Sequence, residues 1–454
     1  MDTPHQQELF GTDGIRGVAG EPPLDPATIF AVGVCLGHSL SRQAAPRRVI
    51  LGEDTRESSR WIAETIAAGL LRAEIEIVAA GVITTPGLAF LTVSEGFAAG
   101  VMISASHNPY RDNGIKVFAS TGLKLPEGEE RAITQEIRRM LEQGNGVFPS
   151  RLVLEPVPAL ASRYVDFLRR AAGLSWSLPG LQLAVDCANG SASSMAGAVF
   201  SNYGMRVRTL ADQPSGRNIN WQCGSLHLEN LQRAVLETKA DLGVALDGDA
   251  DRALFVAADG SIVNGDGVLW AASRSMKQQG TLTGGAVVGT VMSNLGLELA
   301  LAREGIGLRR TSVGDKYVWE EMQRSGVNLG GEPSGHIIFR DQATTGDGLL
   351  TALQVLRLLA EKQCSLAELV EGLAVFPQTI RNVPVREKTP FESLPQVRDA
   401  IEAGEERLGS SGRILVRYSG TEPLARVMVE AVSADDVEQV AAAIAGALEK
   451  SLGV

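Results

Sequence analysis

The sequence predicts an α/β protein made of three related α/β domains with mixed sheets, followed by a smaller α+β domain at the C-terminal end. Two observations indicate this fold class. A strand–turn–helix–strand pattern recurs three times, and the last part of the chain has a different order of elements. The length of 454 residues also exceeds what one hydrophobic core organises, and on its own suggests about three domains.

The repeated pattern begins with "RRVILGEDTRESS", in which an apolar run leads into a polar turn containing glycine. The helix that follows carries Ile62, Ile66 and Leu70 on one face. "LQLAVDCANGSASS" repeats the pattern from Leu181, and "GAVVGTVMSN" repeats it from Gly285. Each helix is followed by a short β-rich run, which is "EIEIV", "MRVRTL" or "GLRRTSV". This order is typical of βαβ units in a parallel or mixed sheet, and the repetition suggests related domains.

The C-terminal part has another organisation. "GRILVRYSG" and "ARVMVEAV" predict two strands around a tight loop, and "SADDVEQVAAAIAGALEKSL" predicts an amphipathic helix with a Ser/Asp start. Proline-containing segments near 155–160 and 374–384 indicate two of the domain boundaries. We therefore expect domains at residues 1–154, 155–258, 259–373 and 374–454.

The composition excludes several classes of protein. The hydrophobic content of 44% and charged content of 21% are typical of globular chains, and no apolar run approaches the roughly 18 residues that span a bilayer. The polar start lacks the apolar core of a signal peptide, which predicts a cytoplasmic protein without a membrane partner. The net charge of −11 argues against nucleic-acid binding. Four scattered cysteines are expected to be reduced and structural: Cys35, Cys187, Cys223 and Cys364.

The stretch "ISASHNPYRDNGIK" ends an apolar run, "AAGVMIS", with serine, histidine, asparagine and proline. An ordinary exit from a strand would explain it, since Asn and Ser bond the local backbone and Pro stops the ladder. On that interpretation Asn113 and Gly114 give a hairpin-turn signal. The alternative is that Ser106 is a nucleophile or phosphate carrier at the carboxyl end of a strand, where α/β sheets place their chemistry.

The segment "LDGDADR" places Asp247, Asp249 and Asp251 at alternate positions after a β-rich run. Carboxylates at this spacing can converge on one hard cation, and Mg²⁺ takes oxygen ligands. An EF-hand is excluded, because positions that would need Gly and Glu hold Arg252 and Ala258. A solvated acidic turn is the alternative. Three carboxylates this close repel one another unless a cation or an arginine compensates, which favours the metal site.

Three further loops offer groups that suit a phosphorylated sugar. In "GGEPSGHIIF", glycines let the backbone approach a ligand, and Glu332 and Ser334 are spaced to bind vicinal hydroxyls; a Gly-rich turn with a chance histidine is the alternative. "FGTDGIRG" adds Arg16 between two glycines. "RYSGTEPLAR" is either a plain hairpin loop or an anion-binding nest formed by Arg417, Ser419, Gly420, Thr421 and Arg426.

Together these loops resemble one family. The motifs "SASHNP", "DGDADR", "GEPSGH" and "RYSGTEP", in this order, are similar to those of the α-D-phosphohexomutases, and the similarity covers essentially the whole chain. "FGTDGIRG", "SASHNPYRDNGIKVF" with "GLKLP" after it, and "ATTGDG" most resemble the bacterial phosphoglucosamine mutases. The resemblance implies four domains around one central cleft, the first three being related α/β units.

The resemblance also implies a role for each motif. Ser106 would carry a phosphoryl group, and one Mg²⁺ per chain would be held by Asp247, Asp249, Asp251 and the phosphoserine oxygen. Glu332 and Ser334 would contact sugar hydroxyls, whereas Arg417, Ser419, Gly420, Thr421 and Arg426 would bind the non-reacting phosphate. The catalytic set would be completed by Lys116 and His336 as acid/base groups, with Arg16, Arg252 and His107 at the reaction site.

The implied reaction interconverts glucosamine 6-phosphate and glucosamine 1-phosphate through a phosphoserine enzyme and a 1,6-bisphosphate, which also serves as activator. It would supply the biosynthesis of UDP-N-acetylglucosamine and the cell wall, and the enzyme would be a monomer or homodimer. Phosphomannomutase or phosphoglucomutase activity is the alternative within the family. Pro333 stands where the family usually has Gln or Met, and Tyr418 where Pro is frequent.

Two other classes of function stay open. A metal-dependent phosphatase would use the same aspartate loop but needs no second anion pocket, so "RYSGTEP" argues against it. A non-catalytic sugar-phosphate-binding relative would be expected to have lost Ser106 or an aspartate, and all four residues are present.

Overall fold

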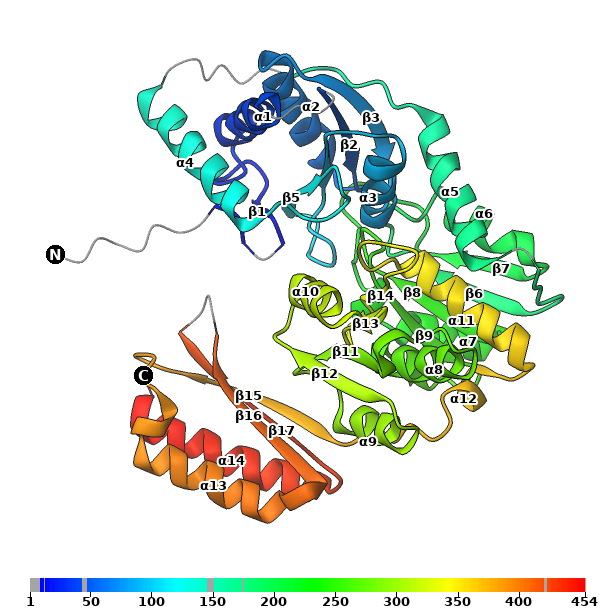
Figure 1. The fold of residues 1–454 in the computed structure, drawn as a ribbon, viewed down its shortest axis with the longest axis vertical. Coiled ribbons are helices and arrows are strands. Elements are labelled where there is room, and N and C mark those ends of the chain that lie inside the picture. Colours follow the sequence, from blue (N-terminus) through cyan, green and yellow to red (C-terminus); the bar gives the residue numbers. More distant parts are fainter. Residues whose placement is uncertain are drawn as a thin grey trace. The chain divides into compact units, whose positions relative to one another are not determined.

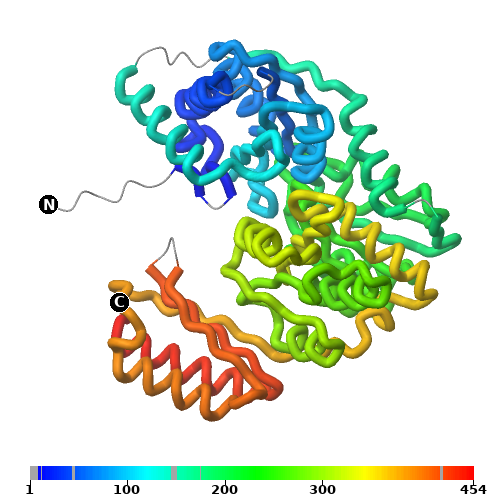
Figure 2. The backbone as a smooth tube through the Cα atoms, viewed as in Figure 1, coloured from blue at the N-terminus to red at the C-terminus, as the bar shows by residue number. Residues whose placement is uncertain are grey.

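The computed structural model describes residues 9–11, 13–42, 47–144, 151–173, 175–419 and 423–453. The chain forms two compact units, which Figures 1 and 2 show as a ribbon and as a tube. Unit 1 comprises Met1–Met292 and Leu308–Glu371, and unit 2 comprises Ser293–Gly307 and Gly372–Val454.

The first sheet of unit 1 has the strand order β1-β5-β4-β2-β3. Strand β2 pairs in parallel with β3 and with the central strand β4, whereas β5 pairs antiparallel with β4 and β1, so the sheet is mixed. Its strands are β1 (Ile15–Val18), β2 (Arg48–Glu53), β3 (Glu76–Val82), β4 (Ala99–Ile103) and β5 (Asp112–Ala119). The accompanying helices are α1 (Pro26–Ser41), α2 (Ser59–Arg72), α3 (Thr85–Ser94) and α4 (Glu127–Gln143).

The second sheet has the order β10-β9-β8-β6-β7, in which β6 is parallel to β7 and β8 while β9 is antiparallel to β8. Its strands are β6 (Gln182–Asp186), β7 (Arg206–Leu210), β8 (Leu242–Leu246), β9 (Ala253–Ala257) and β10 (Ile262–Val263). The helices of this part are α5 (Pro158–Ala172), α6 (Ala196–Phe200) and α7 (Glu229–Thr238).

The third sheet has the order β12-β11-β13-β14. Strand β13 is parallel to β11 and antiparallel to β14, so this sheet is mixed as well. The strands are β11 (Ala286–Thr290), β12 (Gly307–Thr311), β13 (Leu329–Gly331) and β14 (Ile337–Phe339). The helices are α8 (Gly265–Gln278), α10 (Asp315–Ser325), α11 (Gly348–Lys362) and the short α12 (Leu366–Leu369), while α9 (Leu295–Arg303) belongs to unit 2.

Unit 2 is a three-stranded antiparallel sheet with two long helices, α13 (Pro395–Leu408) and α14 (Ala434–Leu452). The strand order is β15-β17-β16, with β15 at Gln378–Pro384, β16 at Gly412–Tyr418 and β17 at Leu424–Ala431. The buried faces of β17 and α14 meet in one core, which contains Val427, Val429, Val440 and Ile444. As predicted from the Ser/Asp start, the Ser433 side chain caps α14 by accepting a hydrogen bond from the Asp436 N–H.

The three mixed sheets and the smaller α+β unit confirm the predicted fold class. The four predicted domain ranges and the central cleft stay predictions. None of the described helices is both long and apolar enough to cross a membrane.

Candidate active site

Ser106 lies in the loop that follows β4, and its side chain is buried, with 1% of the residue exposed. Its hydroxyl donates a hydrogen bond to Asp247 Oδ2 at 2.5 Å, and His107 Nδ1 lies 3.2 Å from Ser106 Oγ. The backbone of Ser106 has φ of 51°, a left-handed conformation that non-glycine residues rarely adopt. Such strain persists only where the surroundings hold it in place, and it is frequent at active sites.

The loop does not turn where the Asn-Gly signal predicts. Asn113 and Gly114 lie inside β5, and the connection from β4 is made by residues 104–111, so the hairpin-turn interpretation is wrong. The physical reason is that the Asn113 side chain is buried and donates to the hydroxyls of Ser58 and Ser59. Its amide therefore anchors the strand to the start of α2 instead of forming a turn.

The three aspartates lie between β8 and β9 and are all buried. One oxygen of each of Asp247, Asp249 and Asp251 lies within 4.8 Å of the others. Two oxygens, Oδ1 of Asp249 and Oδ1 of Asp251, are buried and have no hydrogen-bond partner among the described residues. Buried carboxylate oxygens without a partner are costly, and a divalent cation would satisfy them. The donor set therefore fits a metal ion.

The pKa values of Asp247 and Asp251 are shifted in opposite directions. Burial, reinforced by the charges of Asp251 and Asp249, raises the pKa of Asp247 well above its usual value. Burial also acts to raise the pKa of Asp251, but the Lys116 charge and the His336 hydrogen bond outweigh it and place that pKa below the usual value. The opposite shifts arise because Lys116 and His336 compensate Asp251, whereas Asp247 is buried and repelled by its two neighbours; a cation at the cluster would relieve that repulsion.

A buried lysine compensates part of this charge. Lys116 lies on β5, is 2% exposed, and its Nζ is 2.9 Å from Asp249 Oδ2, 3.2 Å from Asp13 Oδ2 and 3.8 Å from Asp251 Oδ2. Burial acts to lower the pKa of Lys116, but the charges of Asp13, Asp249 and Asp251 outweigh it and raise the pKa. The ammonium group is therefore held in its charged form beside Asp249 and Asp251 of the cluster.

Two arginines and one histidine surround the same region. Arg16, on β1, pairs with Asp13 and donates to Ala105 O at 3.3 Å, which places it beside the loop of Ser106. Arg252 donates its backbone N–H to Asp247 Oδ1 at 3.2 Å, and its Nε lies 3.7 Å from Asp251 Oδ1. Burial, followed by the charges of Arg252 and Arg16, lowers the pKa of His107 to about 4. His107 is therefore neutral near pH 7 without a phosphate beside it.

Close backbone contact joins the two loops. A Cβ atom on Gly248 would lie only 2.5 Å from Ser106 O, so only glycine permits this approach. The glycine that separates the first two aspartates is thus the position at which the acidic loop contacts the serine loop.

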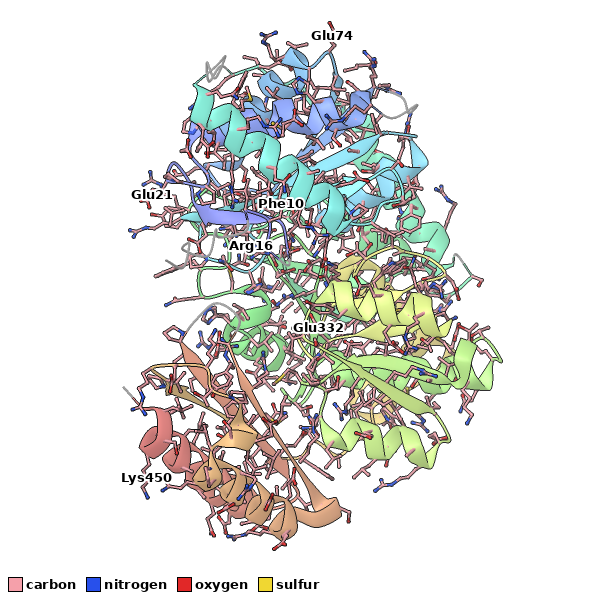
Figure 3. All side chains as sticks on the ribbon, turned by 60° about the vertical axis from the view of Figure 1, so that its left-hand side comes forward. Phe10, Arg16, Glu21, Glu74, Glu332 and Lys450 are labelled. Carbon is pink, nitrogen blue, oxygen red and sulfur yellow. The ribbon has the colours of Figure 1, made fainter. Side chains whose placement is uncertain are left out.

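The predicted sugar-binding residues lie in the turn between β13 and β14. Glu332 is largely buried, accepts from Gly314 N–H at 3.0 Å, and is labelled with Arg16 in Figure 3. Ser334 Oγ is buried and has no hydrogen-bond partner among the described residues, and a ligand hydroxyl would satisfy it. The turn closes with a bond from Gly335 N–H to Glu332 O, and Pro333 occupies the second position, where its missing N–H is not needed.

The "ATTGDG" segment positions His336. Gly346 N–H donates to His336 Nε2 at 3.0 Å, so that nitrogen is the acceptor, and Nδ1 lies 3.6 Å from Asp251 Oδ2. A Cβ on Gly346 would lie 2.5 Å from the imidazole ring. Both ring nitrogens of His336 therefore face protein groups, and the ring connects this segment with the acidic cluster.

The predicted phosphate-binding residues belong to unit 2. Arg417 on β16 and Arg426 on β17 are directly opposite each other in the antiparallel pair, and Ser419 follows β16 with 4% of its surface exposed. Burial and then the charge of Arg426 lower the pKa of Arg417. Like charges directly opposite in a sheet are destabilising, and an anion between them would compensate. Gly420 and Thr421 lie outside the described residues.

Several contacts of the site were not predicted. Asp13 pairs with three cations, because Lys124 Nζ also lies 2.7 Å from its Oδ1. Thr85, at the start of α3, donates its hydroxyl to Asp249 Oδ2 at 2.5 Å and its N–H to Asp249 O. Asp13 and Lys124 stand in the motifs "FGTDGIRG" and "GLKLP", which is the only sequence signal for them; Thr85 has none.

Known families match all along the chain. Residues 7–143 match "Phosphoglucomutase/phosphomannomutase, alpha/beta/alpha domain I", residues 162–260 match domain II of that family, residues 264–376 match domain III, and residues 381–447 match its C-terminal domain.

Curated relatives and solved structures agree with this. A phosphoglucosamine mutase of Solibacter usitatus is 50% identical over 98% of this chain and 99% of that protein, and one of Koribacter versatilis is 52% identical over 100% and 99%. A phosphoglucomutase/phosphomannomutase family protein of Burkholderia thailandensis matches with a TM-score of 0.80 at 24% identity, covering 98% of each chain. The N-acetylphosphoglucosamine mutase of Aspergillus fumigatus, in complex with GlcNAc-6P and magnesium, matches with a TM-score of 0.69 at 19% identity, covering 97% of this chain and 95% of that one. These last two likenesses concern the fold.

Proposed function

Because the chain belongs to the phosphoglucomutase/phosphomannomutase family, and within it to the phosphoglucosamine mutases, we propose that it interconverts glucosamine 6-phosphate and glucosamine 1-phosphate. The observation that carries this proposal is the buried hydroxyl of Ser106, bonded to Asp247 of a three-carboxylate cluster. A serine beside a cation site is the arrangement that a phosphoryl carrier needs.

The proposed reaction has two transfers. The bond between Ser106 Oγ and phosphorus breaks as the O1 hydroxyl of glucosamine 6-phosphate bonds to that phosphorus, which gives the 1,6-bisphosphate. The hydroxyl proton leaves O1, and a proton returns to Ser106 Oγ. The bisphosphate then turns, and the bond between O6 and its phosphorus breaks as Ser106 Oγ bonds to that phosphorus and gives up its proton. O6 takes a proton, and glucosamine 1-phosphate leaves. The same bisphosphate, supplied from outside, would act as activator by phosphorylating Ser106.

We assign one Mg²⁺ per chain to Asp247, Asp249, Asp251 and the phosphoserine oxygen. The buried oxygens of Asp249 and Asp251 that have no hydrogen-bond partner among the described residues support this, as does the magnesium named with the Aspergillus enzyme. When bound, the ion would supply charge stabilisation for the transferring phosphoryl group. Phosphoserine itself brings roughly −1.5 to −2 charge next to the carboxylates, which makes a cation necessary.

The cations of the chain would stabilise the remaining charge. We propose Lys116 for the first acid/base position; its raised pKa keeps the ammonium group charged, so it would also stabilise negative charge, and Arg16 and Arg252 would contact the transferring group. His107, next to Ser106 Oγ, would contact the same group. We propose His336 for the second acid/base position, although both of its ring nitrogens face protein groups in the present geometry.

Sugar and phosphate would be recognised by separate loops. We propose that Glu332 and Ser334 bind the sugar hydroxyls, supported by the buried and unpartnered Ser334 Oγ. The non-reacting phosphate would bind to unit 2 through Arg417, Ser419, Gly420, Thr421 and Arg426. The opposed arginines of β16 and β17 support that assignment.

The remaining proposals concern context. We propose a cytoplasmic enzyme, monomeric or homodimeric, that supplies amino-sugar biosynthesis and binds no nucleic acid or membrane. Domains at 1–154, 155–258, 259–373 and 374–454 would contribute the serine, metal, sugar and phosphate loops. Phosphoglucomutase or phosphomannomutase activity is the alternative, and Pro333, which is neither the Gln nor the Met usual at this position, does not distinguish between them.

One purified sample tests the proposal. Turnover is measured with the 6-phosphates of glucosamine, glucose and mannose, each with and without its 1,6-bisphosphate. We expect the highest kcat/KM for glucosamine 6-phosphate and activation by the bisphosphate. A higher kcat/KM for glucose or mannose phosphate would support the alternative, and release of inorganic phosphate as the main product would identify a phosphatase.

A further inference from the structure

Two side chains from distant parts of the chain hold the same two carbonyl groups of the serine loop. Arg56 Nη2 donates to Ser106 O at 3.0 Å and to Asn108 O at 2.9 Å. Asn220 Nδ2 donates to Ser106 O at 2.8 Å and to Asn108 O at 3.1 Å. Each carbonyl oxygen has two lone pairs, so the two donors complete both acceptors.

The guanidinium group of Arg56 uses all of its N–H donors within unit 1. Its side chain is completely buried, and its five N–H groups meet five acceptors: Asp54 Oδ2 and the carbonyls of Ser106, Asn108, Pro109 and Asp112. A guanidinium fork can satisfy five acceptors, whereas a lysine ammonium has three donors. The whole turn from Ser106 to Asp112 is therefore wrapped around one arginine.

The partner of Arg56 extends the same network to the start of the loop. Asp54 accepts from Arg56 N–H at 3.0 Å, from Ser59 Oγ at 2.6 Å and from Ser104 Oγ at 2.7 Å. Ser104 Oγ in turn accepts from Ser106 N–H at 3.0 Å. Both the amide and the carbonyl of Ser106 are thus fixed by hydrogen bonds that begin at residues 54–56.

Asn220 connects the loop with the sheet that carries the aspartates. It lies between β7 and α7, its own N–H donates to Ala188 O, and its φ is 58°. A Cβ on Gly248 would lie 2.9 Å from Asn220 Nδ2 and 2.5 Å from Ser106 O. Asn220 is therefore packed against the acidic loop while it holds the serine loop.

We propose that Arg56 and Asn220 are positioning residues for phosphoryl transfer, which together fix the backbone of Ser106 over the aspartate cluster. The inference rests on the proposed role of Ser106 as phosphoryl carrier. A phosphoserine adds roughly −1.5 to −2 charge next to three buried carboxylates, and their repulsion pushes the loop away. Donors on both sides of the two carbonyls oppose that displacement without contacting the substrate.

Asn220→Gly tests the proposal directly. Glycine tolerates the φ of 58°, so the substitution deletes the donor without adding backbone strain. Misplacement of a reacting group by about 1 Å can lower the rate by roughly 100-fold, so we expect kcat to fall by about 10- to 100-fold while KM changes less than about threefold. Phosphate lost to water per turnover should rise, because the phosphoserine is held less firmly.

The same loop offers a matched control. Gln222 is exposed, has φ of 52°, and lies two residues from Asn220. Gln222→Gly makes the same substitution in the same conformation, so it should keep wild-type kcat. A structural effect of glycine on this loop would appear in both variants, whereas the proposed effect appears only in Asn220→Gly.

A double-mutant cycle sharpens the test. Arg56→Lys keeps the charge opposite Asp54 but cannot supply five donors. Because both residues hold the same two carbonyls, their effects on kcat should be non-additive, as is usual for residues that share partners. Additive effects, or wild-type kcat in Asn220→Gly, would overturn the inference.

The measurements distinguish an error in the proposed function from an error in the positioning role of Arg56 and Asn220. The wild type is first measured for turnover and for a phosphate adduct by intact mass. If it shows both and Asn220→Gly matches it in kcat, only the positioning role is overturned. If the wild type shows neither, the phosphoserine mechanism is wrong and the inference falls with it.

Discussion

Two loops of this protein follow a strand and are assigned to phosphate, yet they are held in different ways. The loop of Ser106 is buried and bonded from several elements of unit 1, through Arg56, Asn220 and Asp247. The loop after β16 belongs to a two-stranded hairpin, in which Ser419 bonds to Leu424 O and to Lys388 within unit 2. The backbone of the first loop is held by side chains from distant parts of the chain, whereas the bonds described for Ser419 of the second are to Leu424 and Lys388 of unit 2.

The difference matches the demands of the proposed reaction. The carrier must return to one position for both transfers, so a rigid backbone favours it. The anchor must hold either end of a bisphosphate and release it while the intermediate turns. Arg417 and Arg426, opposite each other on the two strands beside this loop, would bind either phosphate of the intermediate in turn. The predictions below test each half of the comparison, beginning with the largest expected effect.

The hydroxyl group of Ser106 should be indispensable for mutase activity. Ser106→Ala removes the phosphoryl acceptor, so we expect mutase activity to fall by at least about 1,000-fold, since covalent transfer has no other route. Ser104 cannot replace it easily, because its hydroxyl is committed to Asp54. Activity and intact mass are measured together, and the variant should lack the phosphate adduct.

A control separates chemistry from folding in that experiment. Ser193→Ala removes another hydroxyl of unit 1, which bonds only to the local carbonyl of Gly190 among the described contacts. It should keep wild-type turnover. Near-normal turnover in Ser106→Ala would contradict the carrier role.

Substitution within the aspartate cluster should lower the activity almost as much as loss of the Ser106 hydroxyl. Asp249→Asn removes a carboxylate that Lys116 and Thr85 also contact, so we expect a loss of roughly 100- to 1,000-fold in kcat that excess Mg²⁺ does not restore. Treatment of the wild type with a chelator should abolish turnover, and added Mg²⁺ should restore it.

An exposed aspartate supplies the comparison for this variant. Asp259→Asn alters only a surface turn with Ser261 and should leave the metal dependence unchanged. Full wild-type activity in the presence of the chelator would show that the cluster serves another purpose.

Loss of Arg417, a proposed phosphate-binding residue of unit 2, should raise KM more than it lowers kcat. Arg417→Ala deletes charge-assisted hydrogen bonds, each worth about 1.5–3 kcal/mol, which corresponds to a rise in KM of roughly 10- to 150-fold. The bisphosphate should also escape, so free 1,6-bisphosphate appears and added bisphosphate stimulates more strongly. Arg381→Ala, on β15 of the same sheet and paired with Glu438, should change neither quantity. An unchanged KM with no released intermediate would place the anchor elsewhere.

The smallest effect concerns the free energy of unfolding of unit 1. Burial raises the pKa of Asp347 to about 6, and Asp347 Oδ2 accepts from the buried Tyr164 hydroxyl at 2.8 Å. Between the ordinary pKa of about 3.9 and about 6, the folded protein retains a proton that the unfolded chain has lost. The free energy of unfolding therefore falls as pH rises through this window, by up to roughly 3 kcal/mol.

Asp347→Asn should remove that slope. Urea denaturation at pH 4.5 and pH 7 measures it, and the exposed Asp166→Asn serves as control because it should retain the wild-type slope. Equal slopes in wild type and Asp347→Asn would mean that Asp347 is ionised throughout.

The sequence predicts the reactive residues of the site better than it predicts the residues that hold them in place. The strand-then-polar-loop pattern locates Ser106 and the alternate spacing locates the three aspartates, because each of these signals is local. The repeated βαβ pattern likewise predicts the mixed sheets of unit 1. The proposed roles of individual residues still depend on the experiments above.

The residues that hold the serine loop in place have no comparable local pattern in the sequence. Arg56 and Asn220 lie 50 and 114 positions from Ser106, and only the folded chain brings them to its carbonyl. Asn113 misleads for the opposite reason: the Asn-Gly pair is a strong local turn signal, but burial against Ser58 and Ser59 overrides it.

The central claim is that Ser106 exchanges its phosphoryl group with the amino sugar. It is tested most directly by placing a radiolabelled phosphoryl group on Ser106, adding unlabelled glucosamine 6-phosphate, and following the label through a single turnover. The account predicts that the label leaves the protein and appears in glucosamine 1,6-bisphosphate and then in glucosamine 1-phosphate, with little inorganic phosphate. Label that stays on the protein while product forms, or that is released only as inorganic phosphate, would contradict it.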